Sequence, residues 1–262
     1  MATIIKCNVD QCYGIEIDEA AVQIATVALW LTDHQMNMAV GNRLGTHIAR
    51  LPLDKKANIV CANALQIDWG SVLSAAQCNY IVGNPPFIGS SYQTKEQKAD
   101  AALVFNDLNG AGVLDYVAAW YVKAADYIKG HPAVPVVLVS TNSICQGEQV
   151  AILWGYLLAQ GIHIHYAHRT FRWSNEGRGV AAVHCVIIAF GLSQPKQCIL
   201  FDYGDDISGD SVRIAANNIN PYLVDAPTVL MDKRRKPLCT DVPEMVYGSK
   251  PTDGGNLLLS QE

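Results

Sequence analysis

The segment Asn84-Pro85-Pro86-Phe87 follows a short apolar run at residues 79–83 and combines an amide, two prolines and an aromatic ring. Neither proline donates a backbone N–H and each fixes its own φ, so a strand that reaches Asn84 must end there and turn. In an open α/β sheet, a turn at the carboxyl end of a strand lies over the ligand site. The Asn84 amide and a neighbouring carbonyl can accept both N–H hydrogens of a planar amino group, while Phe87 offers a flat face for stacking. This set suits a flipped-out nucleobase whose amino nitrogen is to be methylated, and it requires no acid, base or metal ion.

The elements that must hold this turn in place alternate between strand and helix patterns. Short apolar runs predict strands, and apolar positions three or four apart predict helices. Asp18 is placed as the N-cap of the first helix. The expected order is strand 12–18, a helix after Asp18, strand 57–65, strand 80–87, helix 114–128, strand 134–143, helix 147–159, and strands 162–171 and 181–190 joined across a turn. These elements predict a doubly wound, Rossmann-like α/β sheet closed by a late β-hairpin.

Composition narrows the class of protein. The chain has 262 residues of which 50% are apolar, enough to build a core of ordinary size. No apolar run reaches the about 18 residues that span a bilayer. The first residues also lack the basic and apolar regions of a leader, so we expect a cytoplasmic protein without membrane contact. The 8 cysteines contain no close CxxC pair, which favours reduced, buried thiols over disulfides or a structural zinc site.

Charge and histidine patterns give weaker signals. The formal net charge of −5 argues against a protein that binds nucleic acid over its whole surface. Two local clusters of basic residues are Arg169, Arg172 and Arg178 around an expected turn, and the run 233–236. Each cluster also fits an ordinary solvated surface. His163, His165 and His168 form an HxHxxH pattern, which we interpret as the polar positions of a strand and not as metal ligands.

Several motifs together resemble one enzyme family. The tetrapeptide at 84–87 resembles the Asp/Asn-Pro-Pro-aromatic motif of amino-methyltransferases that use S-adenosylmethionine, specifically DNA adenine-N6 methyltransferases. The segments YGIEID, ANAL, VPVVLVSTNSICQG and RTFRWSNEGRGVAAVHCVIIAF are similar to successive strand ends, the strand after the catalytic helix and the late hairpin of that family. With NPYLVDAP and KPTDGGNLLLS they resemble the MmeI-like branch (type IIG/IIL), in which methylation and target recognition share one polypeptide.

The resemblance implies a site-specific DNA methyltransferase that acts on the N6 amino group of a flipped adenine in double-stranded DNA, with S-adenosylmethionine as cofactor. By this resemblance, the catalytic motif consists of Asn84, Pro85, Pro86 and Phe87, and the cofactor is bound by Glu16, Ile17, Asn63 and Ala64. The rings expected to stack on the target base are Phe87 and Phe171. The residues expected to contact DNA are Arg169, Arg172 and Arg178. By the same resemblance, Glu16 would accept hydrogen bonds from the ribose hydroxyl groups of the cofactor. Asn63 stands where the family commonly has an aspartate that contacts the adenine amino group. Trp173 is the alternative to Phe171 as second stacking ring.

The same comparison predicts a partial domain. Residues 1–195 are expected to form a methyltransferase core without its first strand and without the Gly-rich cofactor motif, and residues 196–262 an irregular segment that leads toward a target-recognition domain. Flanking parts of a parent chain are therefore expected, and the isolated fragment is expected to be inactive. The alternatives among enzymes are a protein-glutamine, an RNA or a cytosine-N4 methyltransferase, each using the same kind of loop. A non-catalytic recognition module is the alternative outside enzymes.

Overall fold

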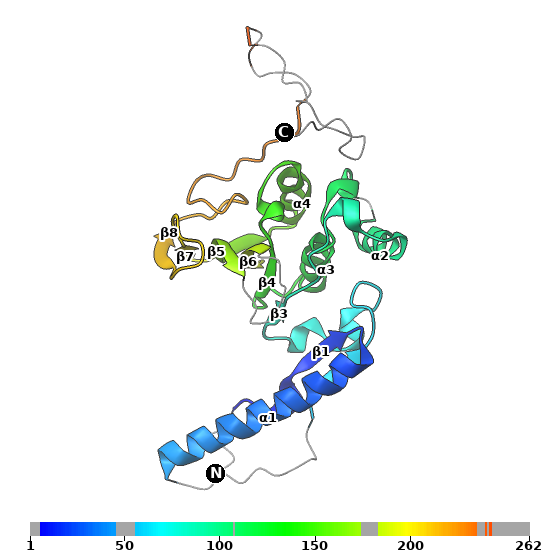
Figure 1. Cartoon of the computed structure of the whole chain (residues 1–262), viewed down its shortest axis with the longest axis vertical. Coiled ribbons are helices and arrows are strands. Elements are labelled where there is room, and N and C mark those ends of the chain that lie inside the picture. The colour runs from blue at the N-terminus through cyan, green and yellow to red at the C-terminus, as the bar shows by residue number, and fades with distance from the viewer. Residues whose placement is uncertain are drawn as a thin grey trace, which may run out of the picture. The chain divides into compact units, whose positions relative to one another are not determined.

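The computed structural model describes residues 6–45, 56–106, 108–173, 183–234, 239 and 241–242. The chain divides into two compact units, Met1–Leu230 and Met231–Glu262, and the elements below all belong to the first. Its helices and strands, coloured along the chain in Figure 1, are β1 (Tyr13–Glu16), α1 (Glu19–Leu44), β2 (Asn58–Cys61), β3 (Ile81–Gly83), α2 (Lys95–Phe105), α3 (Ala118–Tyr127), β4 (Val136–Thr141), α4 (Glu148–Ala159), β5 (His163–Trp173), β6 (Val183–Gly191), β7 (Cys198–Asp202) and β8 (Val212–Ala216).

The first three elements form one β-α-β unit. Strands β1 and β2 pair in parallel, with Glu16 opposite Cys61 at their carboxyl ends. Between them, α1 begins where the Asp18 side chain accepts a hydrogen bond of 2.8 Å from the backbone N–H of Ala21. The predicted N-cap is thus confirmed. The helix ends at Gly45, whose left-handed φ of 63° suits a residue without a Cβ atom.

The larger sheet has six strands in the order β3-β4-β6-β5-β7-β8. Strand β3 is parallel to β4, β6 is antiparallel to both β4 and β5, and β7 is parallel to β5 and antiparallel to β8. The antiparallel β5–β6 pair confirms the predicted late hairpin. The sheet is mixed, because it contains both parallel and antiparallel pairs. Of the two hairpin strands, the later one, β6, lies next to β4, and β5 lies beyond it.

The structure differs from the sequence-based expectation in its sheets. The sequence predicts a single sheet, whereas the described strands form two, because β1 pairs only with β2 and β3 only with β4. The doubly wound arrangement stays a prediction. So does the domain boundary at residue 195, although β7 and β8 continue the six-stranded sheet beyond it. Helix α2 was not predicted, because its positions lack a clear apolar stripe.

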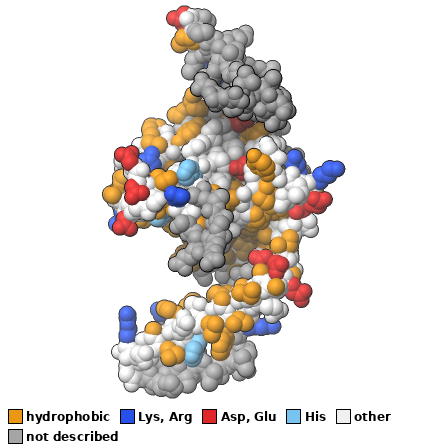
Figure 2. All heavy atoms as spheres, in the orientation of Figure 1, with side chains coloured by type: hydrophobic (Ala, Val, Ile, Leu, Met, Phe, Trp, Pro, Cys, Tyr) orange, Lys and Arg blue, Asp and Glu red, His pale blue; other side chains and the backbone are white. Residues whose placement is uncertain are grey.

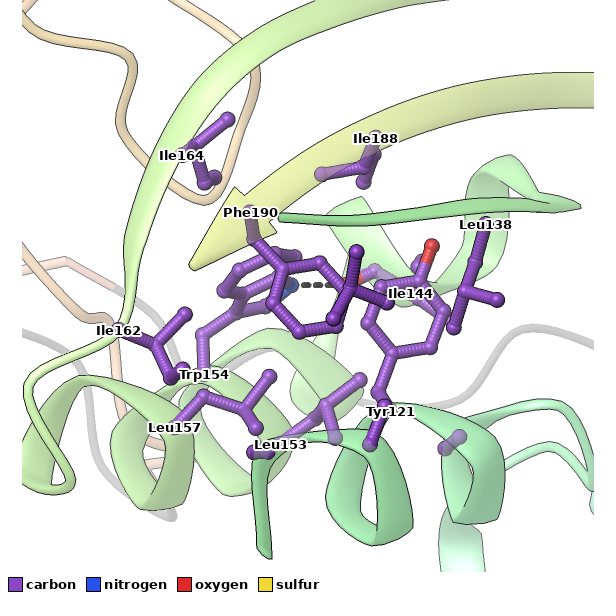
Figure 3. Packing of buried hydrophobic residues seen from close by; sticks show 14 of the residues in the cluster. Tyr121, Leu138, Ile144, Leu153, Trp154, Leu157, Ile162, Ile164, Ile188 and Phe190 are labelled. Carbon is purple, nitrogen blue, oxygen red and sulfur yellow. Dashed lines mark hydrogen bonds between the residues drawn. The ribbon is translucent and has the colours of Figure 1, made fainter. Parts of the chain in front are cut away.

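Helices α3 and α4 supply the core that supports the six-stranded sheet (Figures 1 and 3). Tyr121 of α3 stacks on Phe190 of β6 with ring centroids 5.2 Å apart. Trp154 of α4 donates a 2.9 Å hydrogen bond from its indole N–H to the carbonyl of Ile144, the bond drawn as a dashed line in Figure 3. All four residues are fully buried. The segment that follows β4 is therefore held against α4, while α3 packs on β6.

Apolar side chains are also exposed on the surface, most visibly along α1 (Figure 2). Ile24, Val27 and Met36 of this helix are 69%, 56% and 62% exposed. Within the described residues, no helix combines the length and the apolar character that crossing a bilayer requires.

Candidate active site

The Asn-Pro-Pro-Phe segment forms a turn directly after β3. Strand β3 ends at Gly83, where an added Cβ atom would lie 3.1 Å from Leu138 Cδ2 of β4, so this close strand packing favours glycine. The next residue, Asn84, is exposed, while Pro85 is buried and Phe87 packs partly buried against the hydrophobic core. The Asn84 side chain makes no hydrogen bond to another described residue. Its amide is therefore accessible on a turn whose neighbours are anchored.

Three hydrogen bonds fix the turn to the segment before α3. The backbone N–H of Tyr116 donates to the carbonyl of Ile88 at 2.8 Å. The N–H of Ser90 donates to Oδ1 of Asp115 at 3.2 Å. Further along, Nε2 of Gln93 donates to the carbonyl of Leu114 at 3.1 Å. The chain that follows the Asn-Pro-Pro-Phe turn is thus bound to the segment before α3 at three residues, Ile88, Ser90 and Gln93.

Asp115 extends this anchor to the carboxyl end of β4. Its side chain is only 9% exposed, and its Oδ2 accepts a 2.5 Å hydrogen bond from the hydroxyl of Ser143. The hydroxyl of Ser143 also lies 2.7 Å from that of Thr141, the last residue of β4. The backbone N–H of Asp115 donates to Oε1 of Gln149 in α4 at 3.0 Å. Asp115 therefore connects three parts of the fold. Its carboxylate bonds to the segment after the turn and to the segment after β4, and its backbone N–H bonds to α4.

The residues predicted to bind the cofactor lie at the paired ends of β1 and β2. Glu16 is partly exposed, and one of its carboxylate oxygens accepts a 3.0 Å hydrogen bond from the N–H of Asp18. Ile17 is 68% exposed. The carbonyl of Ile17 lies 3.7 Å from the Cys61 sulfur, so the residue that follows β1 lies beside the last residue of β2. This edge offers a carboxylate and an accessible apolar side chain side by side.

Asn63 is held at both ends of its side-chain amide. Its Oδ1 accepts a 2.9 Å hydrogen bond from the backbone N–H of Leu65. Its Nδ2 donates a 2.8 Å hydrogen bond to Oδ2 of Asp100 in α2. The next residue, Ala64, accepts a 2.9 Å hydrogen bond at its carbonyl from the indole N–H of Trp69. The loop after β2 is therefore ordered around the residues predicted to contact the adenine of the cofactor.

Asp100 and Tyr116 connect this loop to the Asn-Pro-Pro-Phe turn. The phenol of Tyr116 donates to Oδ2 of Asp100 at 3.4 Å, while the backbone N–H of Tyr116 holds Ile88. Burial, and then the nearby Asp100 carboxyl, raise the pKa of Tyr116 to about 12, so the phenol stays protonated and can donate at neutral pH. One series of hydrogen bonds therefore connects Asn63, through Asp100 and Tyr116, to Ile88, the residue directly after the Asn-Pro-Pro-Phe turn.

Phe171 lies on the long strand β5 in a group of aromatic rings. Its ring stacks on that of Tyr203 at 5.4 Å and lies 6.0 Å from the ring of Trp173. In the sheet register Phe171 is opposite Cys185, which is opposite Thr141 at the carboxyl end of β4. Phe171 is thus level with the edge of the sheet that carries Asn84. No ring contact joins it to Phe87 within the described residues, and the choice between Phe171 and Trp173 stays a prediction.

The three arginines predicted to touch DNA differ in their surroundings. Arg169 forms an ion pair of 2.6 Å with Asp202. Hydrogen bonds from the N–H of Gly204 and from Arg169 lower the pKa of the Asp202 carboxyl. The side chain of Arg172 is exposed, and its backbone N–H donates to the carbonyl of Ile207 at 2.8 Å. Arg178 lies outside the described residues.

Two of the three histidines of β5, His165 and His168, have structural partners. His165 Nε2 lies 2.8 Å from the carbonyl of Ser193, and His168 Nδ1 lies 2.8 Å from the hydroxyl of Tyr203. His168 also stacks on Phe201 with centroids 4.2 Å apart. Burial lowers the pKa of both imidazoles. Across the described residues, no three histidine, cysteine or acidic side chains gather as a metal site would require.

Sequence reasoning missed the three residues that assemble the site, Asp100, Asp115 and Tyr116. A signal existed for Asp100, because Thr94 and Gln97 form a capping box that marks the start of α2. For Asp115 there was none, since its partners Ser90 and Ser143 are 25 and 28 residues away.

Comparisons with known proteins agree on one family. A family model described as "MmeI, DNA-methyltransferase domain" matches residues 2–202. "DNA methyltransferase A" of Bacillus subtilis (strain 168) is 38% identical over 256 residues, which cover 97% of this chain and 28% of that protein. The solved structure of the type IIL restriction-modification enzyme MmeI in complex with DNA is 54% identical, with a TM-score of 0.91 over 98% of this chain and 34% of that one. The chain thus spans about a third of the length of these relatives.

Proposed function

We propose that this chain, which belongs to the family of MmeI DNA-methyltransferase domains, is part of a restriction-modification enzyme that methylates the N6 amino group of adenine in double-stranded DNA with S-adenosylmethionine as methyl donor. One observation carries the proposal: an exposed Asn84 amide on a turn whose neighbours are anchored by Tyr116 and Asp115. The family gives the reaction class. The anchored amide gives the group that would receive the target base.

The proposed chemistry depends on hydrogen-bond acceptors at the turn. Oδ1 of Asn84 and the carbonyl of Pro85 would each accept one N–H of the target amino group. Accepting both hydrogens draws the nitrogen from planar toward tetrahedral geometry and makes its lone pair available as a nucleophile. Because the turn is already fixed, little conformational freedom is lost when the base binds. Phe87 would supply a stacking face from the same turn, and Phe171 or Trp173 the second one.

The described residues at the ends of β1 and β2 fit an adenosyl group. Glu16 has a second carboxylate oxygen for the ribose hydroxyl groups, and the exposed Ile17 offers an apolar surface to the adenine. Asn63 Oδ1 can accept one more hydrogen bond, because a carbonyl oxygen has two lone pairs and Leu65 occupies only one. When bound, the donor supplies an electrophilic methyl carbon on a sulfonium.

The test measures the product in DNA. The full coding sequence that contains this chain is expressed in a host without DNA methylation, and methylated nucleosides are quantified by mass spectrometry. We expect N6-methyladenine with the unaltered protein and none with Asn84→Ala. Asn84→Asp, which keeps an acceptor oxygen at the same place, is expected to retain part of the activity. Asn217→Ala, at an exposed asparagine after β8, is the matched control and should leave the product unchanged.

Other products would redirect the proposal. N4-methylcytosine in place of N6-methyladenine would keep the loop chemistry and change the base. Unmodified DNA from a folded protein that binds S-adenosylhomocysteine would contradict a DNA substrate and indicate protein glutamine or RNA. A folded protein that binds neither S-adenosylmethionine nor S-adenosylhomocysteine would be evidence for a non-catalytic recognition module.

A further inference from the structure

The side-chain amide of Asn63 can face its partners in only one orientation. Its Nδ2 donates to Oδ2 of Asp100 at 2.8 Å, and its Oδ1 accepts from the N–H of Leu65 at 2.9 Å. Rotating the amide by half a turn would place Oδ1 against the Asp100 carboxylate and Nδ2 against the Leu65 N–H. Two hydrogen bonds would be replaced by one acceptor–acceptor and one donor–donor contact. The hydrogen-bonding network thus determines which end of the amide is an acceptor.

Asp100 is itself fixed, so it can impose this orientation. Its Oδ1 accepts a 2.7 Å hydrogen bond from Nε2 of Gln66, and its Oδ2 accepts from the phenol of Tyr116 at 3.4 Å in addition to Asn63. These donors come from the loop after β2 and from the segment before α3, while Asp100 lies on α2 and is partly buried. The carboxylate is therefore bound both to the loop that carries Asn63 and, through Tyr116, to the segment before α3.

An asparagine needs such a neighbour where an aspartate would not. Both oxygens of a carboxylate accept hydrogen bonds, so either orientation can receive an amino group. An amide accepts at one end and donates at the other. With Oδ1 outward, Asn63 receives the 6-amino group of an adenine; with Nδ2 outward, it would favour a 6-oxo purine such as hypoxanthine instead.

From this geometry we infer that Asp100 is a positioning residue that fixes the Asn63 amide and makes the cofactor site selective for a 6-amino purine. The inference rests on the proposed function, because it requires that Asn63 faces the base of the methyl donor. It goes beyond that function by assigning the base selectivity to a residue on α2, which follows the Asn-Pro-Pro-Phe turn in the chain.

The experiment compares two ligands that differ in the purine 6-substituent, amino in one and oxo in the other, and in the proton on N1 that accompanies the oxo group. Binding of S-adenosylhomocysteine and S-inosylhomocysteine to the full parent protein is measured by isothermal titration calorimetry. The unaltered protein is expected to prefer the adenosyl ligand. An asparagine at position 100 can pair with either end of the Asn63 amide, which leaves only the Leu65 N–H to favour one orientation. Asp100→Asn is therefore expected to lower the ratio of the two affinities by about tenfold, because a mismatched, partly buried polar group is costly. Tyr116→Phe removes only the long, 3.4 Å hydrogen bond to Asp100 and leaves the carboxylate bonded to Gln66 and Asn63, so the ratio should stay unchanged.

A swapped pair separates selectivity from folding. In Asn63→Asp/Asp100→Asn the acceptor faces the ligand in both orientations, and the new amide can still donate to the new carboxylate. We expect the preference for the adenosyl ligand to return to at least that of the unaltered protein. An unchanged ratio in Asp100→Asn, or no recovery in the swapped pair, would overturn the inference while leaving the proposed function intact. If the unaltered protein binds neither ligand, the proposed function fails, and the inference fails with it.

Discussion

The carboxylate of Asp115 accepts a 2.5 Å hydrogen bond from the hydroxyl of Ser143, and this contact joins the segment before α3 to the segment after β4. The other oxygen of the same carboxylate holds the backbone N–H of Ser90, six residues after Asn84 in the chain. Because Asp115 is buried and bonded on both oxygens, the position of the Asn-Pro-Pro-Phe turn depends on the core and not only on its two prolines.

We expect Asp115→Ala to destabilise the protein and to impair the site. The substitution leaves the Ser143 hydroxyl and the Ser90 N–H without their acceptor, at a cost of about 1–3 kcal/mol in the free energy of unfolding. Urea unfolding followed by circular dichroism measures this change. Asp205→Ala removes a carboxylate from an exposed loop and serves as the control, with little expected shift. Equal stability of the two variants would contradict a buried anchor at Asp115.

Much of the fold could be predicted from the sequence because its signals are local. Asp18 marks the start of α1 by side-chain capping, which needs only residues three apart. The apolar run of β4 and the two strands of the β5–β6 hairpin are also recognisable from neighbouring residues. The separation into two sheets was not predictable in this way, since strand pairing depends on residues far apart in the chain.

The site was predicted in part for the same reason. Asn84 and Phe87 belong to a short motif, and Glu16 and Asn63 follow strand ends, so their residue types and places are visible locally. Their hydrogen-bond partners are not. Asn63 meets Asp100 across 37 residues, and Asp115 meets Ser143 across 28. The network that orients the predicted residues therefore emerged only from the tertiary structure.

The buried pair Tyr121 and Ser140 gives a second prediction. Their hydroxyl oxygens lie 2.9 Å apart, and both residues are fully buried. Tyr121→Phe or Ser140→Ala alone leaves one buried hydroxyl without a partner, so each should cost about 1–3 kcal/mol in the free energy of unfolding. The double variant removes both polar groups and should cost less than the sum of the two. A double-mutant cycle from urea unfolding measures the coupling, and strictly additive costs would show that the hydroxyls do not interact.

His168 predicts how stability depends on pH. Burial lowers the pKa of this imidazole in the folded state, so the unfolded chain binds more protons just below the ordinary histidine pKa of about 6.5. The contribution to stability is therefore fully present above that value and is lost as pH falls through the folded pKa. We expect the urea concentration at the unfolding midpoint to decrease as the pH is lowered from 7.5 to 5.5. The His168→Gln variant should show a smaller decrease. His165, whose pKa burial also lowers, remains in the variant and should keep part of the slope. An unchanged slope in His168→Gln would contradict the prediction.

The arginines give a prediction that rests on the proposed binding of DNA. Arg169 already has a carboxylate partner in Asp202 at 2.6 Å, whereas the Arg172 side chain is exposed. Each phosphate contact releases counterions and adds about 0.9 to the slope of log affinity against log salt concentration. Arg172→Gln should therefore reduce the size of this slope for the parent protein by about 0.9, the amount of one phosphate contact, and Arg169→Gln by less. Fluorescence anisotropy with labelled duplex DNA at several salt concentrations measures both slopes.

Arg43→Gln, which replaces an exposed arginine in the last turn of α1, controls for the loss of one positive charge. A larger effect from Arg169 than from Arg172 would mean that DNA displaces Asp202 from its ion pair, and that the paired arginine is the phosphate contact.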